Sequence, residues 1–293
     1  MDIESKKFLG QPKNFVSIFN ALLFDGQPVL KPEYLKDENS ELVMNVSSKH
    51  VDIIKRYEDG TYLDLFVIES QSYVDQCMVA RVMEYESVAR MRYIRQNFKK
   101  HVPMHTRLPM ILTVVLYVGE SKWNAAKRLS ELEIIHPGFE DMFNEFKLNL
   151  IELNTNHKYN TGEKATQDFF DLLRMIYRKQ ILKEDLDREF NRDALYFAYV
   201  VTKNKELLNI YQESEKGDVK VCRALDEMFE ESTNKGIQMG IKQGIEQGVE
   251  RGVKNTQIKI AIKMLVRNNQ TLEEISEIVG LDLDALKELK KSI

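Results

Sequence analysis

Hydrophobic residues recur along the chain at two different spacings, and each spacing predicts a kind of element. In Asn14–Phe24 the apolar side chains return every three or four positions, which is typical of an amphipathic helix. The runs Lys49–Tyr57 and Tyr62–Ser70 are rich in β-branched and aromatic residues and predict two strands. Because Glu58-Asp59-Gly60 separates these runs, an Asp-Gly turn should join them into a hairpin.

The next segments complete an α/β core. Helical spacing continues over Val74–Phe98, and it is followed by the apolar run Met110–Val118. That run lacks polar alternation, as expected of a strand covered on both faces. The order helix, strand, strand, helix, strand predicts a mixed sheet flanked by helices. From about Ala165 onward the pattern is helical. The candidate helices are Ala165–Leu182, Arg192–Tyr211 and Val219–Thr233.

Glycine returns every four residues in the segment that follows. The glycines are Gly236, Gly240, Gly244, Gly248 and Gly252, and each is followed by isoleucine or valine. In a helix each glycine costs about 1 kcal/mol relative to alanine, so this segment needs contacts that offset the loss. Small residues at this spacing let a second helix approach closely, but the many charges exclude insertion into a membrane. Two interpretations remain open, a self-associating helix and a semi-flexible linker.

The tail, residues 257–293, has the outline of a small helical unit. Thr271 and Glu274 form the sequence of a capping box at the start of one helix, Gly280 ends it, and Asp282 can cap another. This is the outline of a helix-turn-helix. Six basic and six acidic side chains balance in the tail, whereas a helix that reads DNA is usually more basic. A packing or dimerisation module is the alternative.

These patterns divide the 293 residues into four segments. We expect a core over residues 1–160, a helical extension over 161–233, the glycine-periodic helix or linker over 234–256 and the tail over 257–293. Apolar and charged fractions of 43% and 30% are ordinary for a globular protein. No run is long enough to cross a bilayer. Cys77 and Cys222 have no metal-site spacing and suggest free thiols, so we expect a cytoplasmic protein.

Basic residues are clustered in one segment of the chain. The net charge of −4 excludes a chain that is basic throughout, but residues 90–107 hold no acid. Their basic residues are Arg90, Arg92, Arg95, Lys99, Lys100 and Arg107. Local clustering of this kind suits a phosphate backbone, and a solvated helix face is the alternative. The nearby pair His101 and His105 is not a metal pair, because Pro103 between them breaks a helix.

Three polar side chains could carry chemistry at the predicted hairpin. Glu69 and Gln71 alternate in the second strand and should project from the same face. Asp52 lies on the first strand, so its carboxylate could meet that of Glu69. Two carboxylates offer oxygen ligands to a hard divalent cation such as Mg²⁺. Gln71 could then position a water, although an amide lacks the charge of lysine. Two exposed acids at strand ends are the alternative.

Several motifs, taken in order, resemble a known family. They are FVSIFNALLFDGQPVL, Asp52 in VDIIKRY, VIESQSYVDQCMVARVMEY, LPMILTVVLYVGESKWNAAKRL, and the glycine-periodic tail with TLEEISEIVGL. In this order the chain resembles the recombination-promoting nucleases, or YhgA-like transposases, of the PD-(D/E)XK nuclease superfamily. The similarity extends over essentially the whole chain.

The resemblance implies roles for individual residues. Asp52 and Glu69 would be the metal ligands, and Gln71 would stand where the superfamily has lysine. Arg81 would face phosphate or support the acids. Related sequences often carry an acid near Ser17 in the first helix, so a third carboxylate would be missing here. Two smaller points are that Val79 replaces a usual proline and that the matching Asn20 would help only weakly.

We therefore expect a Mg²⁺-dependent DNA endonuclease associated with recombination or mobile elements. Asp52, Glu69 and Gln71 would form its centre. Its DNA contacts would be Arg81, Arg90, Arg92, Arg95, Lys99 and Lys100. The alternatives are a DNA-binding or assembly protein that keeps the fold without cleavage, and a structural protein that self-associates through the glycine-periodic helix. Trp123, after Gly119-Glu120, is expected to pack under a loop and not to stack on a base.

Overall fold

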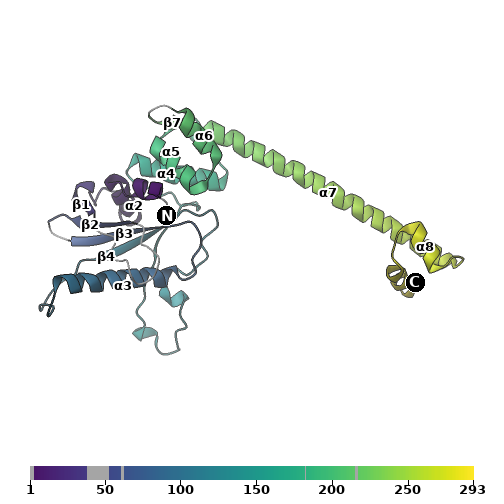
Figure 1. The fold of residues 1–293 in the computed structure, drawn as a ribbon, viewed down its shortest axis with the longest axis horizontal. Coiled ribbons are helices and arrows are strands. Elements are labelled where there is room, and N and C mark those ends of the chain that lie inside the picture. The colour runs from purple at the N-terminus through teal and green to yellow at the C-terminus, as the bar shows by residue number, and fades with distance from the viewer. Residues whose placement is uncertain (1–2, 38–52, 61–62, 182, 215–216) are drawn as a thin grey trace. The chain divides into compact units, whose positions relative to one another are not determined.

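The structure is a computed structural model that describes residues 3–37, 53–60, 63–181, 183–214 and 217–293. It contains two compact units, residues 1–227 and 228–293. A five-stranded sheet in the order β1-β2-β3-β4-β5 forms the centre of the first unit (Figure 1). The strands are β1 (Leu35–Asp37), β2 (Ile53–Glu58), β3 (Leu63–Gln71), β4 (Ile111–Tyr117) and β5 (Asn149–Glu152). β1, β2 and β3 pair antiparallel, and β3, β4 and β5 pair parallel. The predicted mixed α/β core is confirmed.

One face of the sheet is covered by α3 (Met78–Asn97), as Figure 1 shows. Leu65 and Val67 of β3 pack against Tyr85 and Ala89 of this helix. Side chains in a strand alternate between faces, so the residues between them point the other way. Phe66, for example, contacts Phe19, with ring centroids 4.8 Å apart.

The opposite face of the sheet is covered by the helices α2 and α4 (Figure 1). The helices of this layer are α1 (Ile3–Leu9), α2 (Pro12–Phe24), α4 (Lys164–Arg178), α5 (Arg192–Thr202) and α6 (Lys205–Glu213). Phe197 of α5 joins them, because its ring stacks on Phe8 of α1 and on Phe169 of α4, at 4.7 and 4.4 Å between centroids. Burial of these rings excludes water from this second core.

The prediction of one helix over Arg192–Tyr211 is wrong, because the structure divides this segment between α5 and α6. Lys203 adopts a left-handed backbone with φ of 55° and ends α5. Asn204 then caps α6, its side chain accepting a hydrogen bond from the amide of Glu206. Apolar residues on both sides of the break keep helical spacing, so the pattern alone did not reveal the turn.

Several short elements were not predicted from the sequence. They are α1, β1, β5, the small sheet of β6 (Glu189–Phe190) and β7 (Val219–Lys220), and the 3₁₀ turns η1 (Pro32–Tyr34), η3 (Leu129–Glu131), η4 (Glu140–Met142) and η5 (Lys183–Asp185). The predicted hairpin is confirmed, with Ile53 paired to Ile68 and Glu58 to Leu63. The expected first strand began at Lys49, and residues 49–52 lie outside the described part of the chain.

In the second unit the end of a long helix packs with two short ones. α7 runs without a break from Cys222 to Arg267, so its glycine-periodic part is helical. α8 (Leu272–Val279) and α9 (Leu283–Lys291) follow. The predicted capping box and the left-handed Gly280 are both present. Their small core consists of Ala261, Leu265, Ile275, Val279 and Leu286. Among the described residues no helix is long and apolar enough to cross a membrane.

Candidate functional site

Glu69 and Gln71 lie at the end of β3, on the face that α3 covers. Each is only 4% exposed. They pair in parallel register with Val115 and Tyr117 of β4. Two polar side chains thus stand among the apolar residues that pack between α3 and the sheet. Such groups are costly to bury unless they have partners, so their surroundings decide what they can do.

Arg81 in the second turn of α3 is the main partner of Glu69. Its Nη2 lies 3.2 Å from Glu69 Oε1, and its Nη1 donates to Asp75. Nε and Nη2 also lie 3.1 and 2.8 Å from the hydroxyl of Tyr85, one turn further along the helix. One partly buried guanidinium therefore joins the end of β3, the loop before α3 and α3 itself.

The charge state of Arg81 follows from these contacts. Burial would lower the pKa of Arg81, but its hydrogen bonds to Asp75 and Tyr85 and the charge of Glu69 raise it above the ordinary value. Burial raises the pKa of Tyr85, so this phenol stays protonated at neutral pH. Arg81 thus holds a carboxylate oxygen of Glu69 in place. Of the two roles expected for it, the geometry corresponds to support of the acids.

Gln71 has a different environment. Its Nε2 is buried and has no hydrogen-bond partner among the residues that the structure describes. Its backbone carbonyl accepts from the amide of Val118, which fixes the strand end. Buried amide groups are normally hydrogen-bonded. The side chain of Gln71 therefore retains hydrogen-bonding capacity beside Glu69, as a group that positions a water or a phosphate oxygen would need.

The second expected metal ligand, Asp52, lies outside the described residues. Within the described ranges, no group of three or more His, Cys, Asp or Glu side chains is arranged to hold a metal ion. Mg²⁺ keeps several waters and often takes only one or two carboxylates from a protein. The buried carboxylate of Glu69 fits such a cation as one ligand, and Asp52 would have to supply the second. Gln71 lies beside Glu69 and would position a water.

Ser17 and Asn20 do not approach this centre, which corrects the idea that an acid at position 17 would complete it. Ser17 Oγ lies 2.8 Å from both Asn14 O and Thr166 Oγ1, so it faces α4. α2 packs on the face of β3 opposite Glu69, as the Phe19–Phe66 contact shows. The side-chain amide of Asn20 donates to the carbonyl of Leu30 and accepts from its amide, both at 2.9 Å. Both residues stabilise the fold.

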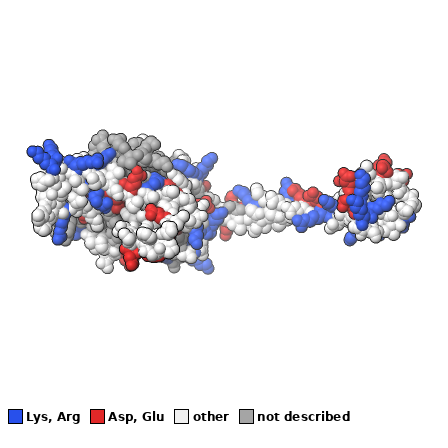
Figure 2. Space-filling model, turned by 90° about the horizontal axis from the view of Figure 1, so that it is seen from below, with Lys and Arg blue, Asp and Glu red and all other residues white. Residues whose placement is uncertain are grey.

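The basic segment begins at the far half of α3. Arg90 is partly exposed and lies 3.8 Å from Glu86, Arg92 is partly buried, and Arg95, Lys99 and Lys100 are exposed. Figure 2 shows lysine and arginine side chains gathered where α3 ends, at the left of the first unit in Figures 1 and 2. A helix rises about 1.5 Å per residue, which places Arg95 about 21 Å from Arg81 along the axis. The basic surface thus leads away from Glu69.

Two expectations about neighbouring residues are confirmed. Trp123 is 3% exposed, donates to the carbonyl of Ala125 and meets Tyr117 edge to face, so it is a packing residue. The segment from His101 to His105 is not helical, because α3 ends at Asn97.

Both cysteines are free thiols, with Cys77 exposed and Cys222 buried.

Asp75, Tyr85 and Glu86 belong to the surroundings of the site but were not predicted. Tyr85 is four residues after Arg81, a helical spacing that could have identified the pair. Asp75 precedes α3 and accepts a hydrogen bond from the amide of Cys77. An aspartate before a helix favours a turn of this kind, so the sequence could have indicated it. Glu86 is buried and accepts from the amide of Thr113 in β4, and no local pattern marks this contact.

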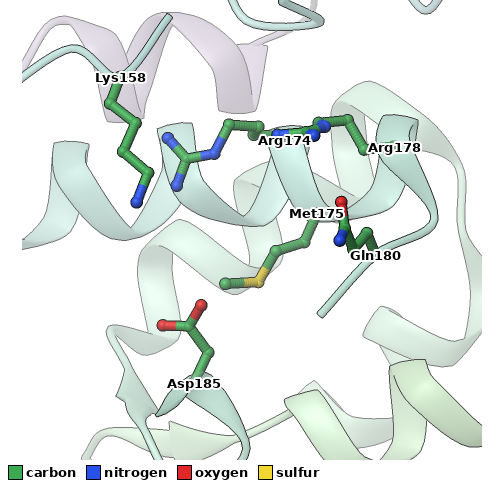
Figure 3. Close-up of a pocket in the computed structure, with 6 residues that line it drawn as sticks. All are labelled: Lys158, Arg174, Met175, Arg178, Gln180 and Asp185. Atoms are coloured by element: carbon green, nitrogen blue, oxygen red, sulfur yellow. The ribbon is translucent and has the colours of Figure 1, made fainter. Parts of the chain in front are cut away.

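A second group of charged residues lies on α4 and the loop that follows it. The buried Asp168 and Asp171 both bind Arg188, at 2.7 and 2.9 Å. A cavity of about 140 Å³ lies nearby, with Lys158, Arg174 and Met175 in its wall (Figure 3). Arg174 is already paired with Asp171 at 2.7 Å, and the acid Asp185 also lines the space. This group connects α4 to the chain that follows, which is a structural role.

A comparison with known families places the chain. The family model described as "Putative transposase, YhgA-like" matches residues 33–207, which is more than half of the sequence. The chain belongs to this YhgA-like family. The match includes β2, β3, α3 and β4, so it contains Glu69, Gln71, Arg81 and the basic segment. No curated protein and no solved structure matched the chain. The family model thus identifies the family, and the chemistry of the site has to be argued from its geometry.

Proposed function

We propose that this YhgA-like protein is a metal-dependent DNA endonuclease that acts with recombination or mobile elements. The observation that carries the proposal is the buried carboxylate of Glu69 at a strand end. Arg81 holds one of its oxygens, and the amide of Gln71 lies beside it. The family description, which names transposases, supports DNA as the substrate. The position of Glu69 supports the proposal as well, because it lies at the end of β3 beside Gln71, whose Nε2 has no partner among the described residues.

Glu69 and Asp52 would hold a divalent cation, with Mg²⁺ the natural choice for oxygen ligands. In the sequence Asp52 directly precedes Ile53, which pairs with Ile68, the residue before Glu69. Bound Mg²⁺ would supply Lewis-acid polarisation of a phosphodiester. Arg81 orients Glu69, and Gln71 contributes hydrogen bonds that orient a water or a phosphate oxygen. Since an amide does not titrate, Gln71 cannot donate a proton as a lysine would.

DNA would lie along α3, with its phosphates contacted by Arg90, Arg92, Arg95, Lys99 and Lys100. The 21 Å between Arg81 and Arg95 corresponds to about six base pairs at 3.4 Å per step. Binding would then weaken steeply as salt rises and would depend little on sequence. Because Arg81 is occupied by Glu69 and Asp75, we assign it to the centre and not to the DNA surface.

Nicking of supercoiled plasmid in the presence of Mg²⁺ tests the proposal. The wild-type protein should nick, and the double variant Asp52→Ala with Glu69→Ala should not. Glu86→Gln is the matched control, because it alters another buried acid of the same layer outside the proposed centre. Cleavage that survives in the double variant would show that these acids are not the catalytic centre.

A protein that binds DNA without cutting it is the second candidate. One observation favours it, because Arg81 occupies an oxygen of Glu69. The resemblance adds that Gln71 would stand where the superfamily has a charged lysine. Binding at low salt, with no cleavage under Mg²⁺, Mn²⁺ or Ca²⁺, would establish this candidate and exclude the first.

The partners we propose are DNA and a second copy of the chain, bound through the glycine-periodic part of α7. We propose the cytoplasm as the compartment. The free and exposed thiol of Cys77 supports a reducing environment.

A further inference from the structure

The pocket at the end of α4 carries more positive charge than the fold uses. Its volume is about 140 Å³. A space of this size holds several waters, which is also enough for one phosphate group. The pocket is lined by Lys158 from the loop after β5, by Arg174, Met175 and Arg178 of α4, by Gln180 just after the helix, and by Asp185 of η5.

The acids around this pocket already have cationic partners. Asp168 and Asp171 bind Arg188 at 2.7 and 2.9 Å, and Asp171 also binds Arg174 at 2.7 Å. Asp185, an acid in the pocket wall, lies 3.7 Å from the same Arg188. These pairs connect α4 to the chain that follows, and they compensate the negative charge beside the pocket.

Two of the basic side chains in the wall take no part in these pairs. Within the residues that the structure describes, the side chains of Lys158 and Arg178 form no hydrogen bond or ion pair, and both residues are exposed. Arg174 binds Asp171 through Nη2 alone among its described contacts, and a guanidinium has five N–H donors. Several donors are therefore available to a ligand that enters from solvent.

The basic side chains converge on one side of the pocket. Figure 3 shows the ammonium of Lys158 and the guanidinium of Arg174 pointing toward one another from two elements, while Arg178 extends toward Arg174. Like charges repel at short range, so an anion between them would stabilise this arrangement. Asp185 lies across the space, with the side chain of Met175 between it and the cations (Figure 3).

We propose that this pocket binds a terminal phosphate group, as an anion site distinct from the proposed metal centre. Lys158 and Arg178 supply two positive charges that no described acid neutralises, and a phosphate monoester carries a charge of about −1.5 to −2 at pH 7. A backbone phosphodiester carries one negative charge, so the charge balance favours the monoester. Guanidinium groups match phosphate oxygens through paired N–H donors.

The opposite wall sets the direction of the ligand. The carboxylate of Asp185 would repel phosphate oxygens, so the phosphate lies at the basic side and the carbon atoms of the ligand lie over Met175. A small sugar phosphate and the 5′-phosphorylated end of a DNA strand share this chemistry. Since α4 covers the face of the sheet opposite Glu69, the inference does not depend on whether the first unit cleaves DNA.

Isothermal titration calorimetry of the full chain with inorganic phosphate tests the proposal, without divalent cations and at constant ionic strength. The wild type should bind one phosphate per chain. Lys158→Gln and Arg178→Gln each remove an exposed charge without breaking a described ion pair, and each should weaken binding at least about fivefold. Lys179→Gln is the matched control, because it removes the same charge at the exposed residue next to Arg178, outside the pocket wall. It should change binding less than about twofold.

Two short DNA strands that differ only in a 5′-phosphate distinguish the sources of the group. If the wild type prefers the phosphorylated strand at least about fivefold, and Arg178→Gln loses this preference, the pocket holds strand ends. If both strands bind equally while inorganic phosphate still binds through Lys158 and Arg178, the pocket holds small phosphate esters.

Three results would overturn the proposal. The first is a wild type that binds no phosphate. The second is phosphate binding that Lys158→Gln and Arg178→Gln leave unchanged, which would place the anion elsewhere. The third is equal weakening by Lys179→Gln and Arg178→Gln, which would reduce the effect to the general charge of the surface. Circular dichroism should give the same spectrum for all four proteins, so that a loss of binding is not a loss of fold.

Discussion

Replacement of Arg81 by methionine tests how the centre is held together. The Arg81 side chain is 17% exposed, and its guanidinium contacts Glu69 and Asp75, whose side chains are 6% and 17% exposed. Removal of the cation leaves two largely buried carboxylates without it, and it also removes the hydrogen bonds to Tyr85. Breaking a buried ion pair from one side costs about 3–5 kcal/mol. We expect the lower end, about 3 kcal/mol, because Asp75 and Arg81 retain some contact with water.

Urea unfolding followed by tryptophan fluorescence measures this loss in the first unit alone. Trp123 is the single tryptophan of the chain, and it is buried in a cluster with Met78, Val79 and Val82 of α3. A slope of about 2 kcal/mol per molar urea converts 3 kcal/mol into a midpoint about 1.5 M lower. Arg95→Met is the control. It removes an exposed arginine in the last turn of the same helix and should cost no more than about 0.5 kcal/mol.

A double-mutant cycle isolates the pair. In a Glu69→Gln background, Arg81→Met should cost about 1–3 kcal/mol less than in the wild type, because the carboxylate that needed the cation is gone. If Arg81→Met lowers stability by less than 1 kcal/mol, or if its cost is the same in both backgrounds, Arg81 does not compensate Glu69 and the reasoning fails.

Four further predictions concern other parts of the molecule. Asp168→Asn should destabilise the first unit by about 3 kcal/mol in the same urea assay, since this buried acid binds both Lys164 and Arg188; a loss below 1 kcal/mol would contradict the network. Burial raises the pKa of Glu86, so its ionised form costs stability above the unfolded pKa and the cost fades as pH falls. The stability of Glu86→Gln relative to that of the wild type should thus increase as the pH rises from 5 to 8, and a difference that does not change with pH would refute this. Burial raises the pKa of Cys222 to about 11, so at pH 8 a thiol reagent should modify one cysteine in the folded protein and both in urea; two fast thiols without urea would disprove it. Gly280→Ala should lower the free energy of unfolding of α8 and α9 by about 1 kcal/mol, because alanine is strained at the φ of 71° that Gly280 adopts; an unchanged melting curve by circular dichroism would exclude such strain.

The elements with strong periodicity could be predicted from the sequence. α2, β3, α3 and β4 lie within a few residues of their expected ranges, because each has a long apolar face or a continuous apolar run. β5 has four residues and, in the part of the chain that the structure describes, joins the sheet through pairing with β4 alone, so no local signal marks it. The break at Lys203 depends on one residue with positive φ, which apolar spacing does not encode.

The candidate site was predictable in part for the same reason. Strand alternation is enough to place Glu69 and Gln71 on one face, and the structure has them there. The contacts of Arg81 with Asp75 and Tyr85 depend on how α3 is rotated over the sheet, which the sequence does not give. Ser17 was misplaced because the resemblance assigns its helix to the site, while packing of Phe19 on Phe66 sets that helix on the other face.

Binding of Mn²⁺, followed by its electron paramagnetic resonance signal, tests most directly whether Glu69 anchors a metal centre. The account predicts that the wild type and Glu86→Gln bind one ion per chain with similar affinity. It also predicts that Glu69→Gln binds at least tenfold more weakly while its Trp123 fluorescence still reports a folded first unit. Equal Mn²⁺ affinity in Glu69→Gln and Glu86→Gln would contradict the proposed centre.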